Sequence, residues 1–240
     1  MAKKKEDVVI INPIKINTAL IRIVGVSPLI VHKWSEKAVK MMEETQQGAG
    51  KTKAKEARDP FSEFYNAIYW VKGQPLSETE ASFDKAFENG ALTGFPLCAI
   101  KQCANSAAYR RGWVKNQMQL RGAYFLRGID DPDMGTIREK PEFRRDMVRI
   151  GMGTADVRYR PYYPEWSMQF YLDYDASDST STWSLENIIN CIEAGGQFVG
   201  IGEWRPEKDG DYGRFRIDRN ELTLLPEGCR TLDELAGLIK

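Results

Sequence analysis

The segment Ser167-Met-Gln-Phe-Tyr-Leu-Asp-Tyr174 predicts the clearest β-strand of the chain. Its apolar side chains occupy every second position: Met168, Phe170, Leu172 and Tyr174. This two-residue period is typical of a strand that buries one face and exposes the other. A sheet built from such strands needs helices on its buried face.

Working outward from this strand, apolar periodicity and capping residues predict the other elements. Strands are expected over 18–26, 121–129, 143–150, 157–159, 198–201 and 214–217, and helices from Ser35, Pro60, Ile100 and Ser184, with a short one near the C-terminus. Gly195 predicts the end of the helix that Ser184 caps, and residues 72–94 predict mostly loop, with one helical turn as an alternative within it. The order indicates an α+β fold, a ferredoxin-like (RRM-like), mostly antiparallel sheet with helices on one face and inserted loops.

The chain predicts one domain over 18–240, after an N-terminal tail over 1–17 and with a mobile basic loop over 46–59. No run of 18 apolar residues is present, and the start does not resemble a signal peptide, so we expect a cytoplasmic protein with no membrane contact. Four scattered cysteines without a Cys-x-x-Cys pair predict reduced thiols and no metal site, and nothing indicates a cofactor.

The net charge of zero hides a segregation of charge along the chain. Residues 101–160 carry 13 basic and 7 acidic side chains, whereas residues 161–240 carry 7 basic and 15 acidic ones. Such a chain can present a basic groove and an acidic back, or stack basic face on acidic face. The alternative is that folding mixes the segments and leaves no patch.

The segment from Gly200 to Arg216 is the most specific part of the sequence. Its glycines and basic or aromatic residues are Gly200, Gly202, Trp204, Arg205, Lys208, Gly210, Gly213, Arg214 and Arg216. Glycines allow close approach to a phosphate, and successive N–H groups form an anion-binding concavity. The spacing fits neither a Walker P-loop nor a dinucleotide fingerprint. The alternative is a hairpin with Asp209-Gly210 as its turn.

Residues 101–160 combine cations with aromatic rings, as single-strand binding requires, because cations follow phosphates and rings stack on bases. The candidates are Lys101, Arg110, Arg111, Lys115 and Arg121, with Tyr109 and Trp113 as rings, and then Arg149, Arg158 and Arg160 as a basic stripe on a sheet. The alternative is a solvated helix face above core aromatics.

His32 is the only histidine and follows the first predicted strand. An isolated histidine is a weak candidate for a general acid or base, since the sequence shows no partner for it. A structural or surface role is the more common one.

Three segments together resemble the RAMP superfamily of CRISPR effector-complex proteins. They are the strand over 18–26, the stretch Gly94-Phe-Pro-Leu-Cys-Ala-Ile-Lys101 before a helix of small residues, and Gly200-x-Gly202 with Gly210-x-x-Gly213-Arg-Phe. The sequence is also similar to prophage-encoded proteins that carry a Gly-Glu-Trp-Arg-Pro stretch.

The resemblance implies a ferredoxin-like fold, a basic face that polymerises along single-stranded RNA, and a protruding hairpin that disrupts base stacking. It implies that Lys101 and the loop over 200–213 lie near the nucleic-acid backbone. His32 falls near the position of a histidine in RNA-processing members. The longer loop, with Trp204 and Pro206, departs from the family and leaves single-stranded DNA open as the ligand.

We therefore expect an oligomeric, non-enzymatic protein that coats or anneals single-stranded DNA or RNA as a filament. Its partners would be further copies, other subunits of a nucleoprotein complex or a phage exonuclease. Two alternatives remain: an RNA-processing endoribonuclease that uses His32, and a protein-only self-assembling or inhibitor module.

Overall fold

The computed structural model describes residues 14–34, 40, 42–44, 46, 58–150, 153–177 and 183–238. The helix expected from Ser35 and most of the basic loop expected over 46–59 lie outside these residues. In the described part, no helix is long and apolar enough to cross a membrane.

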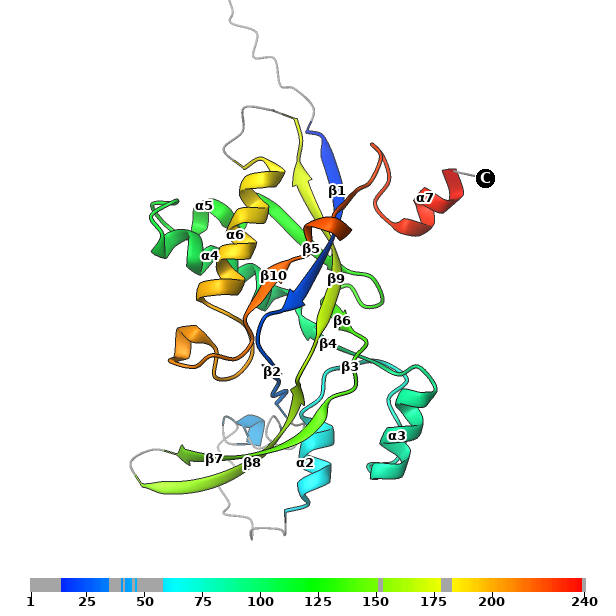
Figure 1. Cartoon of the computed structure of the whole chain (residues 1–240), viewed down its shortest axis with the longest axis vertical. Helices are drawn as coiled ribbons and strands as arrows, with labels where there is room; N and C mark the ends of the chain where they lie inside the picture. The colour runs from blue at the N-terminus through cyan, green and yellow to red at the C-terminus, as the bar shows by residue number, and fades with distance from the viewer. Residues whose placement is uncertain are drawn as a thin grey trace, which may run out of the picture.

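A large sheet forms the centre of the molecule (Figure 1). β9 (Ser167–Asp175) confirms the strand predicted from its alternation, and it pairs along its length with β1 (Ile16–Gly25). β10 (Phe215–Ile217) pairs with the other edge of β1, and β5 (Tyr124–Gly128) pairs with β9. The strand order at this end of the sheet is therefore β10–β1–β9–β5.

Short strands extend this sheet. They are β6 (Met134–Ile137), β4 (Leu92–Pro96), β3 (Trp70–Lys72) and β11 (Thr223–Leu224). Every pairing between described strands is antiparallel. The predicted α+β class with a mostly antiparallel sheet is confirmed.

Two helices, α4 (Leu97–Arg110) and α6 (Leu185–Phe198), pack against each other and against the same side of the sheet. α6 continues through Gly195, so the predicted stop there is wrong. A Cβ on Gly195 would lie 2.8 Å from the backbone nitrogen of Ala104, which shows that glycine permits the close approach of the two helices. The residues after Phe198 form a turn, and the strand predicted over 198–201 is absent from the described part.

A second, smaller sheet carries a projecting hairpin of β7 (Glu142–Ile150) and β8 (Thr154–Tyr163), which pairs at its base with β2 (Leu29–Ile30) (Figure 1). α2 (Pro60–Asn66) packs against β8 and starts at the predicted proline, with Asp59 as its cap.

Residues 72–94 do not form the predicted loop, because they contain α3 (Glu80–Glu88) between β3 and β4. α3 offers little apolar periodicity, since its large apolar residues are only Phe83 and Phe87. Phe83 contacts the rings of Phe61 and Phe64 on α2, and Phe87 contacts the ring of Trp70 on β3; these contacts stabilise the helix. Tertiary packing therefore determines this element.

The C-terminal segment lies on the side of the sheet opposite α4 and α6. Leu225 and Cys229 pack on Leu20 and Tyr171, and the predicted C-terminal helix α7 (Leu232–Leu238) follows. The C-terminal segment thus covers part of this side.

Candidate nucleic-acid interface

The glycine-rich loop connects α6 to β10, and its backbone is hydrogen-bonded to β2 and to the residue that precedes β2. Glu203 N–H donates to the Ile30 carbonyl (3.0 Å), and Gly213 N–H donates to the Pro28 carbonyl (2.8 Å). A Cβ at Gly202, whose φ is +76°, would lie 2.4 Å from the Ile30 carbonyl oxygen. Since a helix precedes the loop, the alternative of a simple β-hairpin is wrong.

Trp204 occupies the left-handed region, with a φ of 54°, although it is not a glycine. Such a conformation is strained for a bulky residue. Two contacts hold it: Gly210 packs so closely that a Cβ there would lie 1.8 Å from the Trp204 carbonyl oxygen, and Tyr212 N–H donates to the same oxygen (3.1 Å). The Trp204 side chain is nevertheless 46% exposed. The loop therefore holds an aromatic ring at the surface in a strained backbone conformation.

Glu207 forms ion pairs with two of the arginines that were predicted to contact phosphates. Arg205 Nη2 and Arg110 Nη2 each lie 2.8 Å from its carboxylate, and Ser106 also donates to it. Burial alone would raise the pKa of Glu207, but these donors hold it below its ordinary value, so the carboxylate is ionised. Arg205 and Arg110 thus lie together beside the loop, and with the Glu207 carboxylate they carry one net positive charge.

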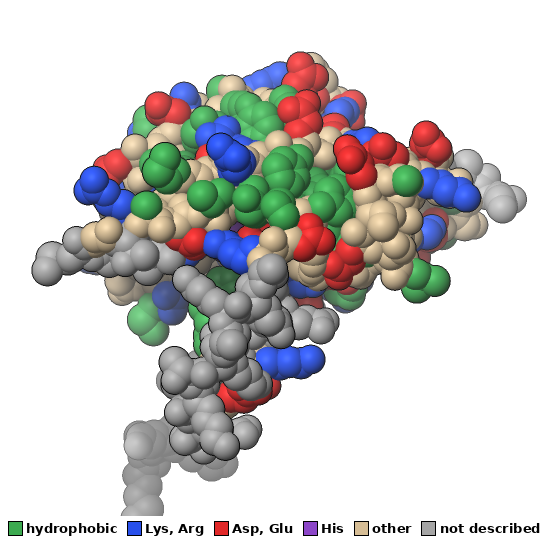
Figure 2. All heavy atoms as spheres, turned by 90° about the horizontal axis from the view of Figure 1, so that it is seen from below, with side chains coloured by type: hydrophobic (Ala, Val, Ile, Leu, Met, Phe, Trp, Pro, Cys, Tyr) green, Lys and Arg blue, Asp and Glu red, His purple; other side chains and the backbone are tan. Residues whose placement is uncertain are grey.

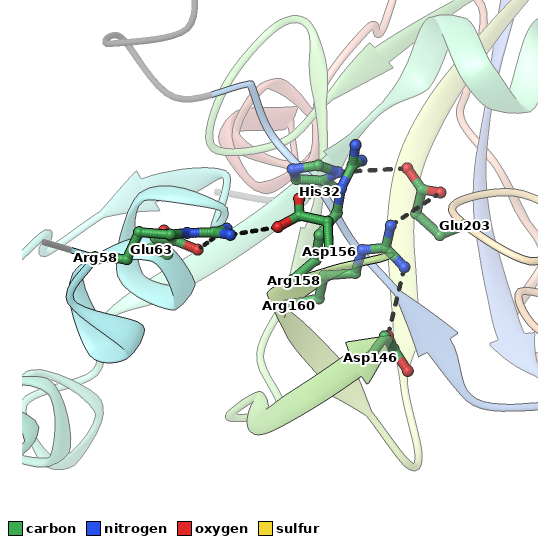
Figure 3. A network of polar contacts seen from close by, with 8 residues as sticks. All are labelled: His32, Arg58, Glu63, Asp146, Asp156, Arg158, Arg160 and Glu203. Carbon is green, nitrogen blue, oxygen red and sulfur yellow. Dashed lines mark hydrogen bonds and ion pairs between the residues drawn. The ribbon is translucent and has the colours of Figure 1, made fainter. Parts of the chain in front are cut away.

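Figure 3 shows a polar network that joins the loop to the hairpin. Its members are His32, Arg58, Glu63, Asp146, Asp156, Arg158, Arg160 and Glu203. Glu203 lies between His32 Nδ1 (3.6 Å) and Arg160 Nη2 (3.8 Å). The polar contact with His32 is the main cause that lowers the pKa of Glu203.

Arg160 has only 2% of its surface exposed and lies between Asp146 and Glu203. Arg158 lies 4.0 Å from Asp156. Asp156 belongs to the same strand as Arg158, so it is Arg160 that connects the hairpin to the loop, and a buried Arg160 is in no position to contact a phosphate. We assign it a structural role.

Two adjoining cavities share His32 and Glu203 in their walls. One, of about 210 Å³, is also lined by Tyr69, Gln102 and the loop backbone. The other, of about 470 Å³, lies toward the hairpin and Arg158. Among the described residues, no group of three or more histidines, cysteines or carboxylates is placed to hold a metal ion.

The other predicted binding residues do not form one continuous channel with the loop. Lys101 donates to the Tyr124 carbonyl and lies over the Phe125 ring, so it supports β5, and burial lowers its pKa. Arg111 lies 4.1 Å from the centre of the Phe198 ring and 5.3 Å from that of Trp113. This group borders the start of the loop, because Phe198 ends α6.

The remaining candidates lie in different places. Arg214 donates to Gln197 beside the loop, Lys208 is exposed within it, Tyr109 and Lys115 are exposed at and beyond the end of α4, Arg121 ends α5 (Met118–Arg121), and Arg149 lies near the hairpin tip. Sequence reasoning did not identify Glu203 and Glu207, the carboxylates that organise the loop. In the sequence, the only indication of a role for these two carboxylates is that they lie between glycines and arginines.

No protein-family model matches the chain, and no curated protein matches it.

Proposed function

We propose that the chain is a single-stranded nucleic-acid-binding protein with a ferredoxin-like fold of RAMP type, which coats or anneals DNA or RNA. The observation that carries this proposal is the strained, half-exposed Trp204 on a loop beside basic side chains. Rings presented in this way stack on unpaired bases of any sequence. Backbone strain of this kind persists where function requires it.

The connectivity supports the ferredoxin-like assignment. The β-α-β-β-α-β order of that fold is present along the chain in β1, α4, β5, β9, α6 and β10, with other elements inserted between them. The four strands share one antiparallel sheet. The glycine-rich loop lies between the last helix and the last strand. The hairpin of β7 and β8 is inserted between β5 and β9 and projects from the body (Figure 1), as the RAMP resemblance leads us to expect.

Both stacking and charge contribute to this binding. Near Trp204, Glu203 pairs with Arg160, whereas the single carboxylate of Glu207 pairs with both Arg110 and Arg205 and leaves one net positive charge. Lys208, Arg111 and Arg214 beside the loop add three more positive charges. Each neutralised phosphate of a single strand contributes about −0.7 to the slope of log K against log salt. With four such charges, we expect a slope of about −2.8.

A filter-binding titration of single-stranded oligonucleotides at several salt concentrations tests the proposal. We expect salt-sensitive binding that double-stranded competitor displaces poorly, because paired bases offer no free face to Trp204. Absence of salt-sensitive binding, or equal affinity for duplex, rejects the proposal.

A second candidate, an endoribonuclease, rests on His32 and Glu203, which line a cavity together as an acid–base pair. In this case the wild-type protein cleaves RNA, and His32→Ala abolishes the cleavage. Cleavage that survives in the His32→Ala variant excludes it.

A further inference from the structure

One face of the molecule extends from the hairpin of β7 and β8 to α3. Figure 1 shows the hairpin tip and α3 on opposite sides of α2, and Figure 2, which looks onto this end, shows apolar side chains gathered at the centre. The face has three parts: an aromatic centre, a basic end on the hairpin and an acidic end on α3.

The aromatic centre is a cleft of about 420 Å³. Four phenylalanines line it: Phe61, Phe64, Phe83 and Phe143. The Phe143 ring lies 5.4 Å from that of Phe64, yet Phe143 is 47% exposed. An open cleft with this lining is typical of a protein contact.

The basic end follows from the alternation of β7. Arg145, Met147 and Arg149 share a strand face with Phe143, and their partners on β8 are Tyr159, Val157 and Ala155. This face therefore carries no carboxylate. Met147 is 78% exposed, and neither arginine forms an ion pair with a described residue.

The acidic end is a stripe on α3. Glu80, Asp84 and Glu88 follow one another at four-residue intervals, and the first two also line the phenylalanine cleft. Asp84 pairs with Lys140 at 2.6 Å, whereas Glu80 and Glu88 have no ion pair with a described residue. With Lys140 included, this end carries a charge of −2, which matches the +2 of Arg145 and Arg149.

We propose that this face binds a second copy of the chain about a two-fold axis. A rotation about an axis that lies in the face, at the aromatic centre, places each basic end on the acidic end of the other copy and both aromatic centres together. Such an interface is self-complementary and closed, as in most homodimers. Its opposite charges favour this partner and orientation. None of these residues belongs to the glycine-rich loop, so dimer formation does not depend on nucleic-acid binding.

Sedimentation equilibrium with two charge reversals tests the contact. Glu80 lines the central cleft and Arg145 lies two strand residues from Phe143, so these two charges lie at similar distances from the axis. Arg145→Glu alone and Glu80→Arg alone each place like charges opposite one another twice, so we expect each variant to dimerise more than about tenfold more weakly than the wild type. When the two variants are mixed, both contacts pair opposite charges again, and the heterodimer forms.

The matched control is Arg121→Glu, which reverses an exposed arginine outside the face and leaves the dimer unchanged. Thermal unfolding of each variant verifies that it folds. The proposal is overturned if the wild type is monomeric at micromolar concentration, if the reversals have no effect, if mixing does not restore the dimer, or if copies associate only when an oligonucleotide is added.

Discussion

At the scale of single residues, the loop between α6 and β10 depends on glycines that no other residue can replace. A Cβ at Gly210 would clash with the Trp204 carbonyl oxygen. A Cβ at Gly213, whose φ is +66°, would clash with the Ile201 carbonyl oxygen. With Gly210 this close, the hydrogen bond that Tyr212 N–H donates to the Trp204 carbonyl oxygen holds Trp204 in its strained conformation. Trp204 and Gly210 therefore act as one unit, in which the glycine positions the ring.

We predict that Trp204→Ala lowers the affinity for a single-stranded oligonucleotide about tenfold to a hundredfold, since one stacked base contributes about 1–3 kcal/mol. Trp204→Phe keeps a ring and should retain most of the affinity. Phe125→Ala, at an exposed ring on β5, is the control and leaves affinity unchanged. Fluorescence anisotropy measures all three, and equal losses for Trp204→Ala and Phe125→Ala would contradict the assignment.

A methyl group at Gly210 meets backbone atoms, which cannot move aside as a flexible side chain can. We predict that Gly210→Ala lowers the free energy of unfolding by about 1–3 kcal/mol and also weakens oligonucleotide binding. Gly112→Ala is a partial control, because nothing lies within 4 Å of its Cβ, although its φ of +70° adds some strain. Chemical denaturation compares the two, and a smaller loss for Gly210→Ala would contradict the role of this close contact.

At the scale of elements, the C-terminal segment is held on the sheet by a buried carboxylate. Asp173 on β9 accepts hydrogen bonds from Thr18, Arg127 and Arg230, each at 2.7 Å. Burial alone would raise its pKa, but these donors lower the pKa of Asp173 from 3.8 to about 2. The cluster connects β1, β5 and β9 to the segment that leads into α7.

Because the folded-state pKa of Asp173 is lowered, its ionised form stabilises the fold fully above about pH 4, and the contribution is lost as the pH falls toward 2. We predict that Asp173→Asn lowers the free energy of unfolding by about 1–3 kcal/mol at neutral pH. The difference from the wild type should shrink between pH 4 and 2 in urea titrations. A difference that stays constant over this range contradicts the account.

The elements with strong periodicity were predictable from the sequence, and those that depend on packing were not. β9, α2 and α7 appear where alternation, Pro60 and the leucine spacing indicated. α3 was missed because its stability comes from aromatic contacts with α2 and β3. The loop was found from its glycines, whereas the ion pairs that occupy Arg110, Arg160 and Arg205 depend on carboxylates distant in sequence, which no local pattern reveals.

At the scale of the whole molecule, folding only partly preserves the segregation of charge along the sequence. Arg110 from the basic region pairs with Glu207 from the acidic one, and Arg160 pairs with Glu203, so much of the expected basic channel is neutralised. Uncompensated charge remains at the hairpin tip and on α3, and also on Lys208 and Arg111 beside the loop. On our two proposals, the surface that binds nucleic acid through Trp204 is separate from the charged surface that binds a second copy.

The most direct test of the central claim is ultraviolet crosslinking of the protein to a single-stranded oligonucleotide, followed by mass spectrometry of the crosslinked peptides. The account predicts that the dominant crosslink lies in the loop over 200–213, at Trp204, and that it disappears in Trp204→Ala. Crosslinks confined to other surfaces, such as Phe125 or the hairpin tip, or no crosslink at all, would contradict it.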